Sequence, residues 1–172
     1  MNAPVFEKAS LDAVTAEAIR VYRREDRVPL LRILEKTEVF NSEELAIALE
    51  LMDAVSDKPG QQDYLIGVYD NGTVAGYYCI GPTPATAGTF DLYWIAVDPS
   101  LHGQGVGSAL IRHAEQLVVS RGGRLIVVET SSRDRYEPTR RFYAAVGYRE
   151  IARIRAYYRP DDDLVVFGKY LS

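Results

Sequence analysis

Three glycines at alternate positions form the part of this sequence best suited to binding an anion. They lie in the segment HGQGVGS, residues 102–108, between an apolar stretch typical of a strand and an amphipathic stretch typical of a helix. Glycine has no Cβ, so successive main-chain N–H groups can approach one anion, and a helix N-terminus adds about half a positive charge. The segment predicts a pyrophosphate site. The alternative is that the glycines only permit a tight turn.

The spacing of these glycines narrows the class of ligand. Gly103, Gly105 and Gly107 follow a G-x-G-x-G pattern, which differs from the G-x-G-x-x-G of dinucleotide sites, and no G-x-x-x-x-G-K-[ST] occurs in the sequence. The loop also lies late in the chain, whereas dinucleotide loops usually occupy the first turn from strand to helix. The pattern therefore favours neither a dinucleotide nor a P-loop nucleotide.

The elements that must position this loop alternate between strands and helices. Asn41 and Glu44 form a capping-box pattern at the start of one helix, 53–63 reads as a polar loop, and Asn71-Gly72 predicts a two-residue hairpin turn. A mixed sheet with helices on both faces is the expected packing. The expected order is a strand at 19–23, helices at 28–38 and from 42, a hairpin of 64–69 and 73–80, a strand at 90–97, a helix from 106, a strand at 125–128, a helix from 138, and strands at 148–157 and 164–171.

Length and composition are those of one soluble globular domain. The chain has 172 residues, of which 47% are hydrophobic and 26% charged. It lacks an apolar run of about 18 residues and a signal-peptide pattern, so we expect a cytoplasmic protein without a membrane partner. A net charge of -4 disfavours nucleic acid and suits a cationic small substrate. Two histidines without a cysteine cluster predict no metal site.

Two stretches of the sequence resemble the signatures of the GNAT N-acetyltransferase superfamily. YWIAVDPSLHGQGVGSALIRHAE, residues 93–115, is similar to its acetyl-CoA signature, R/Q-x-x-G-x-G/A at the start of a helix, and TRRFYAAVGYRE, residues 139–150, is similar to its F-Y-x-x-x-G-[FY]. The resemblance covers residues 19–172 as an acetyltransferase core, with 1–18 as an N-terminal extension. It implies an α/β (α+β) fold whose central sheet is mainly antiparallel.

Two positions depart from the superfamily's usual pattern. His102 stands where Arg or Gln is usual, so it has no permanent charge with which to hold a phosphate. Tyr136 stands six residues before Phe142, where the superfamily often has Asn. Because main-chain amides do most of the binding in this motif, the resemblance still implies that acetyl-CoA is the cosubstrate.

The resemblance implies direct attack of an amine on the thioester, with the cosubstrate held by main-chain groups. A main-chain N–H near Ile95 would stabilise the oxyanion, and Tyr143, the tyrosine of the F-Y pair, would act as the general acid. The alternative for Tyr143 is that it is one of twelve tyrosines and only packs a helix face. The residues implied to bind the cosubstrate are Ile95, Ala96, Val97, His102, Gly103, Gln104, Gly105, Val106, Gly107 and Ser108.

The acceptor side is less defined by the sequence. Asp91 and Glu129, on strands that flank the expected cleft, are the candidates for the general base. The last hairpin often borders the acceptor pocket in this superfamily, which implicates Tyr157, Tyr158 and Asp161, although an acidic turn can simply face water. We expect a small-molecule primary amine as acceptor. A protein lysine or N-terminal acetyltransferase and a non-catalytic acyl-CoA-binding sensor remain the alternatives, and the exposed strand edges are compatible with a homodimer.

Overall fold

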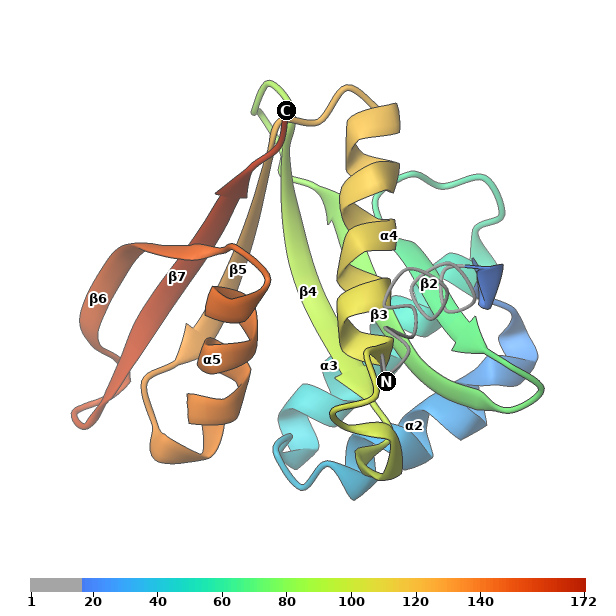
Figure 1. Ribbon diagram of the computed structural model, residues 1–172, viewed down its shortest axis with the longest axis horizontal. Coiled ribbons are helices and arrows are strands. Elements are labelled where there is room, and N and C mark those ends of the chain that lie inside the picture. The colour runs from blue at the N-terminus through green and yellow to red at the C-terminus, as the bar shows by residue number, and fades with distance from the viewer. Residues whose placement is uncertain (1–16) are drawn as a thin grey trace, which may run out of the picture.

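The strands of this protein form one seven-stranded sheet, shown in Figure 1, in a computed structural model that describes residues 17–172. The strand order is β1-β2-β3-β4-β5-β7-β6, and every pair is antiparallel except the parallel pair β4 and β5. The predicted mixed, mainly antiparallel sheet is confirmed. The proposed N-terminal extension, residues 1–18, lies outside the described residues except for 17 and 18. The strands are β1 (Ile19–Val21), β2 (Leu65–Asp70), β3 (Val74–Pro82), β4 (Thr89–Val97), β5 (Leu125–Ser131), β6 (Arg149–Arg159) and β7 (Asp162–Tyr170).

Helices cover both faces of the sheet, as expected. In Figure 1, α4 (Val106–Ser120) and α5 (Glu137–Ala145) lie on the near face, while α2 (Arg27–Lys36) and α3 (Ser42–Asp57) lie behind β2 to β4. Two apolar clusters match these layers, one beneath α4 and α5 and the other beneath α2 and α3. Short 3-10 turns precede α2, α4 and α5, at η1 (Arg24–Asp26), η2 (Pro99–Leu101) and η3 (Asp134–Tyr136).

The helix α3 begins as predicted and ends later than predicted. Asn41 caps it by accepting from the Glu44 N–H over 2.9 Å, while the Glu44 carboxylate accepts from the Asn41 N–H over 2.7 Å. The polar stretch expected to be a loop from residue 53 is instead helical to Asp57. Asp53 is held by two hydrogen bonds from Arg27, at 2.7 and 3.0 Å, so tertiary contacts extend the helix through a polar segment.

The hairpin of β2 and β3 is confirmed, but its turn differs from the predicted one. Asp70 pairs with Val74, so three residues connect the strands instead of two. Gly72 has a φ of 101°, and its N–H donates to the Asp70 side chain over 3.0 Å. A shift in strand register at Tyr69 and Asp70 accommodates the third residue. The Asp70 side chain thus replaces part of the expected turn geometry.

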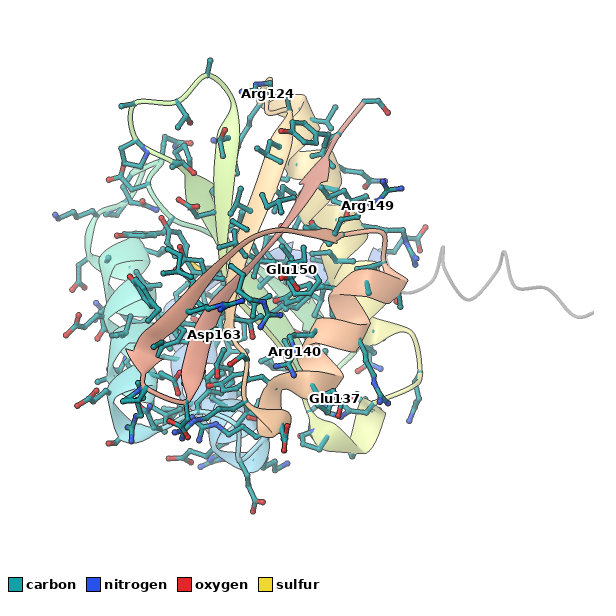
Figure 2. All side chains as sticks on the ribbon, turned by 90° about the vertical axis from the view of Figure 1, so that its left-hand side faces the viewer. Arg124, Glu137, Arg140, Arg149, Glu150 and Asp163 are labelled. Carbon is teal, nitrogen blue, oxygen red and sulfur yellow. The ribbon has the colours of Figure 1, made fainter. Side chains whose placement is uncertain are left out.

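The outer strand β6 lies at the edge of the sheet beside α5 (Figure 2). All its residues are exposed. Arg153 connects this strand to its neighbour, with hydrogen bonds to Glu150 at 2.9 Å and to Asp163 of β7 at 3.2 Å. Within residues 17–172, no helix is long and apolar enough to cross a membrane.

Candidate active site

The site is built on the divergence of the two parallel strands at the centre of the sheet. β4 and β5 pair only at 89–91 and 125–127, and beyond these residues they separate, as Figure 1 shows. A β-bulge in β4 marks this point, because Trp94 pairs with Cys79 and Leu92 with Ile80, which leaves Tyr93 without a partner in β3. Bulges increase the local twist of a strand. The fork between β4 and β5 therefore exposes one edge of β4.

The alternation of the ladder determines which main-chain groups of β4 face the fork. Asp98 N–H donates to Ala75 of β3 over 2.8 Å, so the groups of Ala96, two residues earlier, also face β3. The main-chain groups of Ile95 and Val97, at the alternate positions, point away from β3 and toward the fork. Of the three predicted residues, Ile95 and Val97 thus offer main-chain groups to a ligand in the fork, whereas Ala96 uses its own in the sheet.

The glycine loop ends in an array of free amides at the start of α4. Gly103 and Gly105 have φ values of 77° and 86°, and Gly105 is the N-cap of the helix. Both lie in the left-handed region, which glycine adopts without a Cβ penalty. Within the described part of the chain, no hydrogen-bond acceptor meets the N–H groups of residues 103 and 105–108. Five donors beside a helix N-terminus are suited to binding a pyrophosphate.

The side chain of His102 stabilises the conformation of this loop. Its Nε2 donates to the main-chain oxygen of Val97 over 3.0 Å, which ties the loop to the end of β4. Gln104 turns away from the amides: its side chain donates to Ser100 over 3.2 Å and its N–H to Leu101 over 3.3 Å. All the predicted loop residues except Gln104 line a cavity of about 850 Å³, which we term the loop cavity.

A second cavity of about 700 Å³, which we term the fork cavity, occupies the space between the diverging strands. The two cavities meet, because five residues line both: Val39, Phe40, Ile95, Arg135 and Thr139. A ligand held by the loop amides therefore reaches the fork past Ile95.

Tyr143, on α5, lines the fork cavity. It is 3% exposed, and its ring lies 5.8 Å from that of Tyr148 and 6.0 Å from that of Phe167. Burial raises the pKa of Tyr143, so its hydroxyl keeps its proton at neutral pH. No residue in the described chain forms a hydrogen bond with that hydroxyl. The structure thus places a protonated tyrosine hydroxyl, without a hydrogen-bond partner among the described residues, in a wall of the fork cavity.

The two candidate bases both line the fork cavity, in different surroundings. Asp91 stands at the last paired position of β4 and accepts a hydrogen bond from Thr83 over 2.8 Å. Glu129 lies two positions beyond the pairing region on β5, is exposed, and has no ion-pair partner among the described residues. The fork therefore brings both carboxylates into the cavity that holds Tyr143.

The last hairpin contributes one of its three predicted substrate residues. Tyr158 lines the fork cavity, and burial raises its pKa to about 12. Tyr157 does not line it; this side chain is 56% exposed and packs edge-on against Tyr158, with ring centres 5.0 Å apart. Asp161 is also outside and pairs with Arg133 at 3.2 Å. Tyr157 and Tyr158 are neighbours on β6, so their side chains point to opposite faces of the strand.

Sequence reasoning missed the residues that the segment before α3, α3 itself and η3 contribute to the walls. Phe40 packs edge-on against Trp94 with ring centres 5.0 Å apart, and Glu44 and Tyr136 both line the fork cavity. Glu44 was recognised only as a helix cap. Its position at the cavity depends on how α3 lies across the sheet, which has no local sequence signal. In residues 17–172 no group of three or more His, Cys, Asp or Glu could hold a metal ion.

A sheet that forks beside a helix N-terminus bearing free amides defines a class of acyl-CoA-dependent transferases. The sequence matches the acetyltransferase (GNAT) family over residues 27–148. The chain belongs to this family, and it is an N-acetyltransferase by that membership.

Solved structures agree with this assignment. A candidate GNAT acetyltransferase from Desulfovibrio desulfuricans is 38% identical, with a TM-score of 0.86 over 90% of this chain and 99% of that chain. The ribosomal-protein-S18-alanine N-acetyltransferase of Escherichia coli is 22% identical, with a TM-score of 0.70 over 90% and 93% of the two chains. The aminoglycoside 6'-N-acetyltransferase of Enterococcus faecium is 17% identical, with a TM-score of 0.69 over 88% and 96%. The latter two show likeness of fold alone. Among curated proteins, none matches this sequence significantly.

Proposed function

We propose that this protein transfers the acetyl group of acetyl-CoA to a primary amine of a small molecule. The observation that carries the proposal is the continuity of the two cavities at Ile95, with free amides in one and Tyr143 in the other. Acetyl-CoA supplies an activated acyl group as a thioester. The protein must hold acetyl-CoA and stabilise the developing oxyanion. It must also remove a proton from the ammonium and supply one to the departing thiolate.

The residues of the loop cavity fit coenzyme A. The amides of Gly103 and of residues 105–108 would bind the pyrophosphate, and the main-chain groups of Ile95 and Val97 would bind the pantetheine arm in the manner of an added strand. The cavity walls include Leu101, Pro138 and Phe142, which suit an apolar arm. His102 would act through the loop conformation, because its Nε2 hydrogen is already donated to Val97.

The fork cavity supplies the groups for acyl transfer. The amine attacks the thioester carbonyl, and the Ile95 N–H stabilises the negative charge that forms on its oxygen. Loss of one such donor typically costs about 3 kcal/mol. Tyr143 donates its proton, or a hydrogen bond, to the departing thiolate sulfur. In this proposal the oxyanion is stabilised from β4, by Ile95, and the leaving group from α5, by Tyr143.

Deprotonation of the incoming ammonium falls to Asp91 or Glu129. An ordinary carboxylate is a much weaker base than an alkyl amine, so it takes a proton, directly or through water, from only a small fraction of the ammonium, and the free amine that results then attacks the thioester. Asp91 is held by Thr83 and half buried, which gives it a defined position. Glu129 is exposed and is the alternative.

A small acceptor fits the dimensions and the lining of the fork cavity. Sites for small molecules usually enclose about 300 to 1,000 Å³, and this cavity measures about 700 Å³. Aromatic rings such as Trp94 and Tyr158 line the same cavity as the carboxylates, a combination that attracts an ammonium group. A protein amine as acceptor and a non-catalytic sensor are the competing hypotheses.

The test is an assay of purified protein with acetyl-CoA and a panel of small amines and peptides, with release of the coenzyme A thiol as the readout. Turnover with a small amine, and none with peptides bearing lysine or a free N-terminus, is the expected result. Turnover with peptides alone would mean that the acceptor is a protein amine instead of a small molecule. Binding of acetyl-CoA without turnover on any member of the panel would favour a sensor.

A further inference from the structure

A hydrogen bond crosses the fork cavity between parts of the chain that are distant in sequence. The hydroxyl of Tyr136, in η3, donates to Oε1 of Glu44, in α3, over 3.0 Å and lies 3.5 Å from the main-chain oxygen of Val39. Among the described residues, these are the only hydrogen bonds that join segment 27–57 to segment 125–172. The two walls of the cavity are thus connected through Tyr136.

Both ends of this bridge are held in place. Glu44 is fixed by its other oxygen, which accepts from the Asn41 N–H over 2.7 Å. On the opposite wall, Arg140 of α5, labelled in Figure 2, donates to the main-chain oxygens of Ser131 at 2.7 Å and Arg133 at 2.9 Å, which anchors the segment leading to Tyr136. A bridge anchored at both ends resists widening of the cavity.

The donor of the bridge is buried and stays protonated, and the acceptor Glu44 is half-buried. Tyr136 is 8% exposed, and burial together with the charge of Glu44 raises its pKa to about 12. The hydroxyl therefore donates to the carboxylate throughout the neutral range. Hydrogen bonds to a charged group are stronger than those between neutral groups.

The bridge lies where the two cavities join. Val39, beside which the Tyr136 hydroxyl rests, lines both cavities, and so does Arg135, the chain neighbour of Tyr136. Trp94 and Phe40 form an adjoining wall of the fork cavity. These rings and the bridge therefore line the same cavity as Ile95.

We propose that the Tyr136 to Glu44 bridge limits the width of the acceptor path and so selects amines on an unbranched methylene over amines on a branched carbon. This inference rests on the proposed function of the fork cavity. A branched acceptor must displace a bridge that is tied to α3 and to β5, whereas a slender chain passes without breaking the hydrogen bond. Tyr136 and Glu44 are specificity residues in this scheme, and neither exchanges a proton with the substrate.

The substitution Tyr136→Phe tests the bridge, because it removes the hydroxyl and keeps the ring. Trp94 is the only tryptophan of the chain and lines the fork cavity, so its fluorescence reports on access to that cavity. We expect acrylamide to quench Trp94 more strongly in the variant. We also expect the ratio of kcat/KM for n-butylamine to that for 2-aminobutane to fall by about tenfold, in line with the loss of one hydrogen bond to a charged group.

The matched control is Tyr170→Phe, which removes a hydroxyl from a side chain that is 70% exposed on β7. It should leave both measurements at their original values. Equal quenching in Tyr136→Phe and the original protein would show that the bridge does not limit access to the cavity. An unchanged ratio of kcat/KM for the two amines would show that the bridge does not select between them. If no form acetylates either amine or any member of the panel, the proposed activity fails, and the quenching comparison still decides whether the bridge closes the cavity.

Discussion

The imidazole of His102 donates its Nε2 hydrogen to the main-chain oxygen of Val97 over 3.0 Å, which connects the glycine loop to the strand that it follows. This bond gives a residue without permanent charge a structural part in the proposed phosphate site. Two contributions to cosubstrate binding can therefore be tested separately. His102 affects the conformation of the loop, and the glycines provide its free amides.

His102→Ala should therefore weaken acetyl-CoA binding without abolishing it. The variant loses one hydrogen bond that holds the loop, worth about 1 kcal/mol, while all five amides remain. We expect the Kd for acetyl-CoA, measured by calorimetry, to rise by about fivefold. A loss of binding as complete as that of a Gly105 variant would mean that His102 contacts the phosphates directly.

Gly105→Val should abolish measurable acetyl-CoA binding. Gly105 has a φ of 86°, a conformation that disfavours any side chain, and a branched residue would move the amides that begin α4. The control is Gly60→Val, because Gly60 has the same φ of 86° and, like Gly105, no atom within 4 Å of the position that a Cβ would occupy. Both variants should lose similar thermal stability, and only Gly105→Val should lose binding. If the two variants bind acetyl-CoA equally well, the loop is not part of the cosubstrate site.

Tyr143→Phe should lower kcat by about a hundredfold, the usual scale of a lost general acid. The ring still packs against its aromatic neighbours, so stability should change little. Tyr148→Phe is the matched control, because Tyr148 is also a buried tyrosine of the same core, yet it does not line the fork cavity. Burial raises the pKa of Tyr143, so its deprotonation should not limit the rate below about pH 10. A fully active Tyr143→Phe enzyme would refute the assignment.

Asp91→Asn should make the reaction depend more strongly on pH. Without a carboxylate to accept the proton, only the free amine reacts, so kcat/KM should rise about tenfold per pH unit until the amine's own pKa is reached. The comparison is Glu129→Gln, measured over the same range of pH with one amine. If the steeper profile appears with Glu129→Gln instead, the exposed carboxylate is the base. If it appears with neither, the proton leaves by another route.

Asp26 should make stability sensitive to acid. Burial opposes its ionisation, but hydrogen bonds from Arg20, at 2.7 and 2.8 Å, and from the Arg23 N–H outweigh burial and lower its pKa below the ordinary 3.8. The stabilisation is therefore present above pH 3.8 and is lost as pH falls through the lower, folded-state pKa. Asp26→Asn should cost about 2 kcal/mol in urea unfolding at neutral pH and less in acid.

An exposed pair of the same kind provides the control for that experiment. Arg24 and Asp57 also form an ion pair, but their side chains are 71% and 58% exposed. Asp57→Asn should change the free energy of unfolding by less than about 0.5 kcal/mol. A similar loss in both variants would show that burial adds nothing to the Asp26 contact.

The sequence by itself determined the features that depend on local backbone conformation. Glycines with positive φ and a helix start are encoded within a few residues, so the loop at residues 102–108 was predictable, as were the capping box at Asn41 and the F-Y pair that carries Tyr143. The family and the general fold followed from these local patterns. Even the exceptions were small, since α3 continued only to Asp57 in a polar stretch that Arg27 stabilises from another helix.

Only the tertiary structure decided which side chains share the fork. The ladder between β3 and β4 turns the main-chain groups of Ala96 to β3 and those of Ile95 and Val97 to the side that the divergence of β5 leaves open. On β6, Tyr158 lines the cavity and Tyr157 does not. Glu44 and Tyr136 meet across 92 positions of sequence. Such contacts depend on strand register, bulges and the placement of whole helices, which arise from the summed packing of the chain and leave no signal in a short segment.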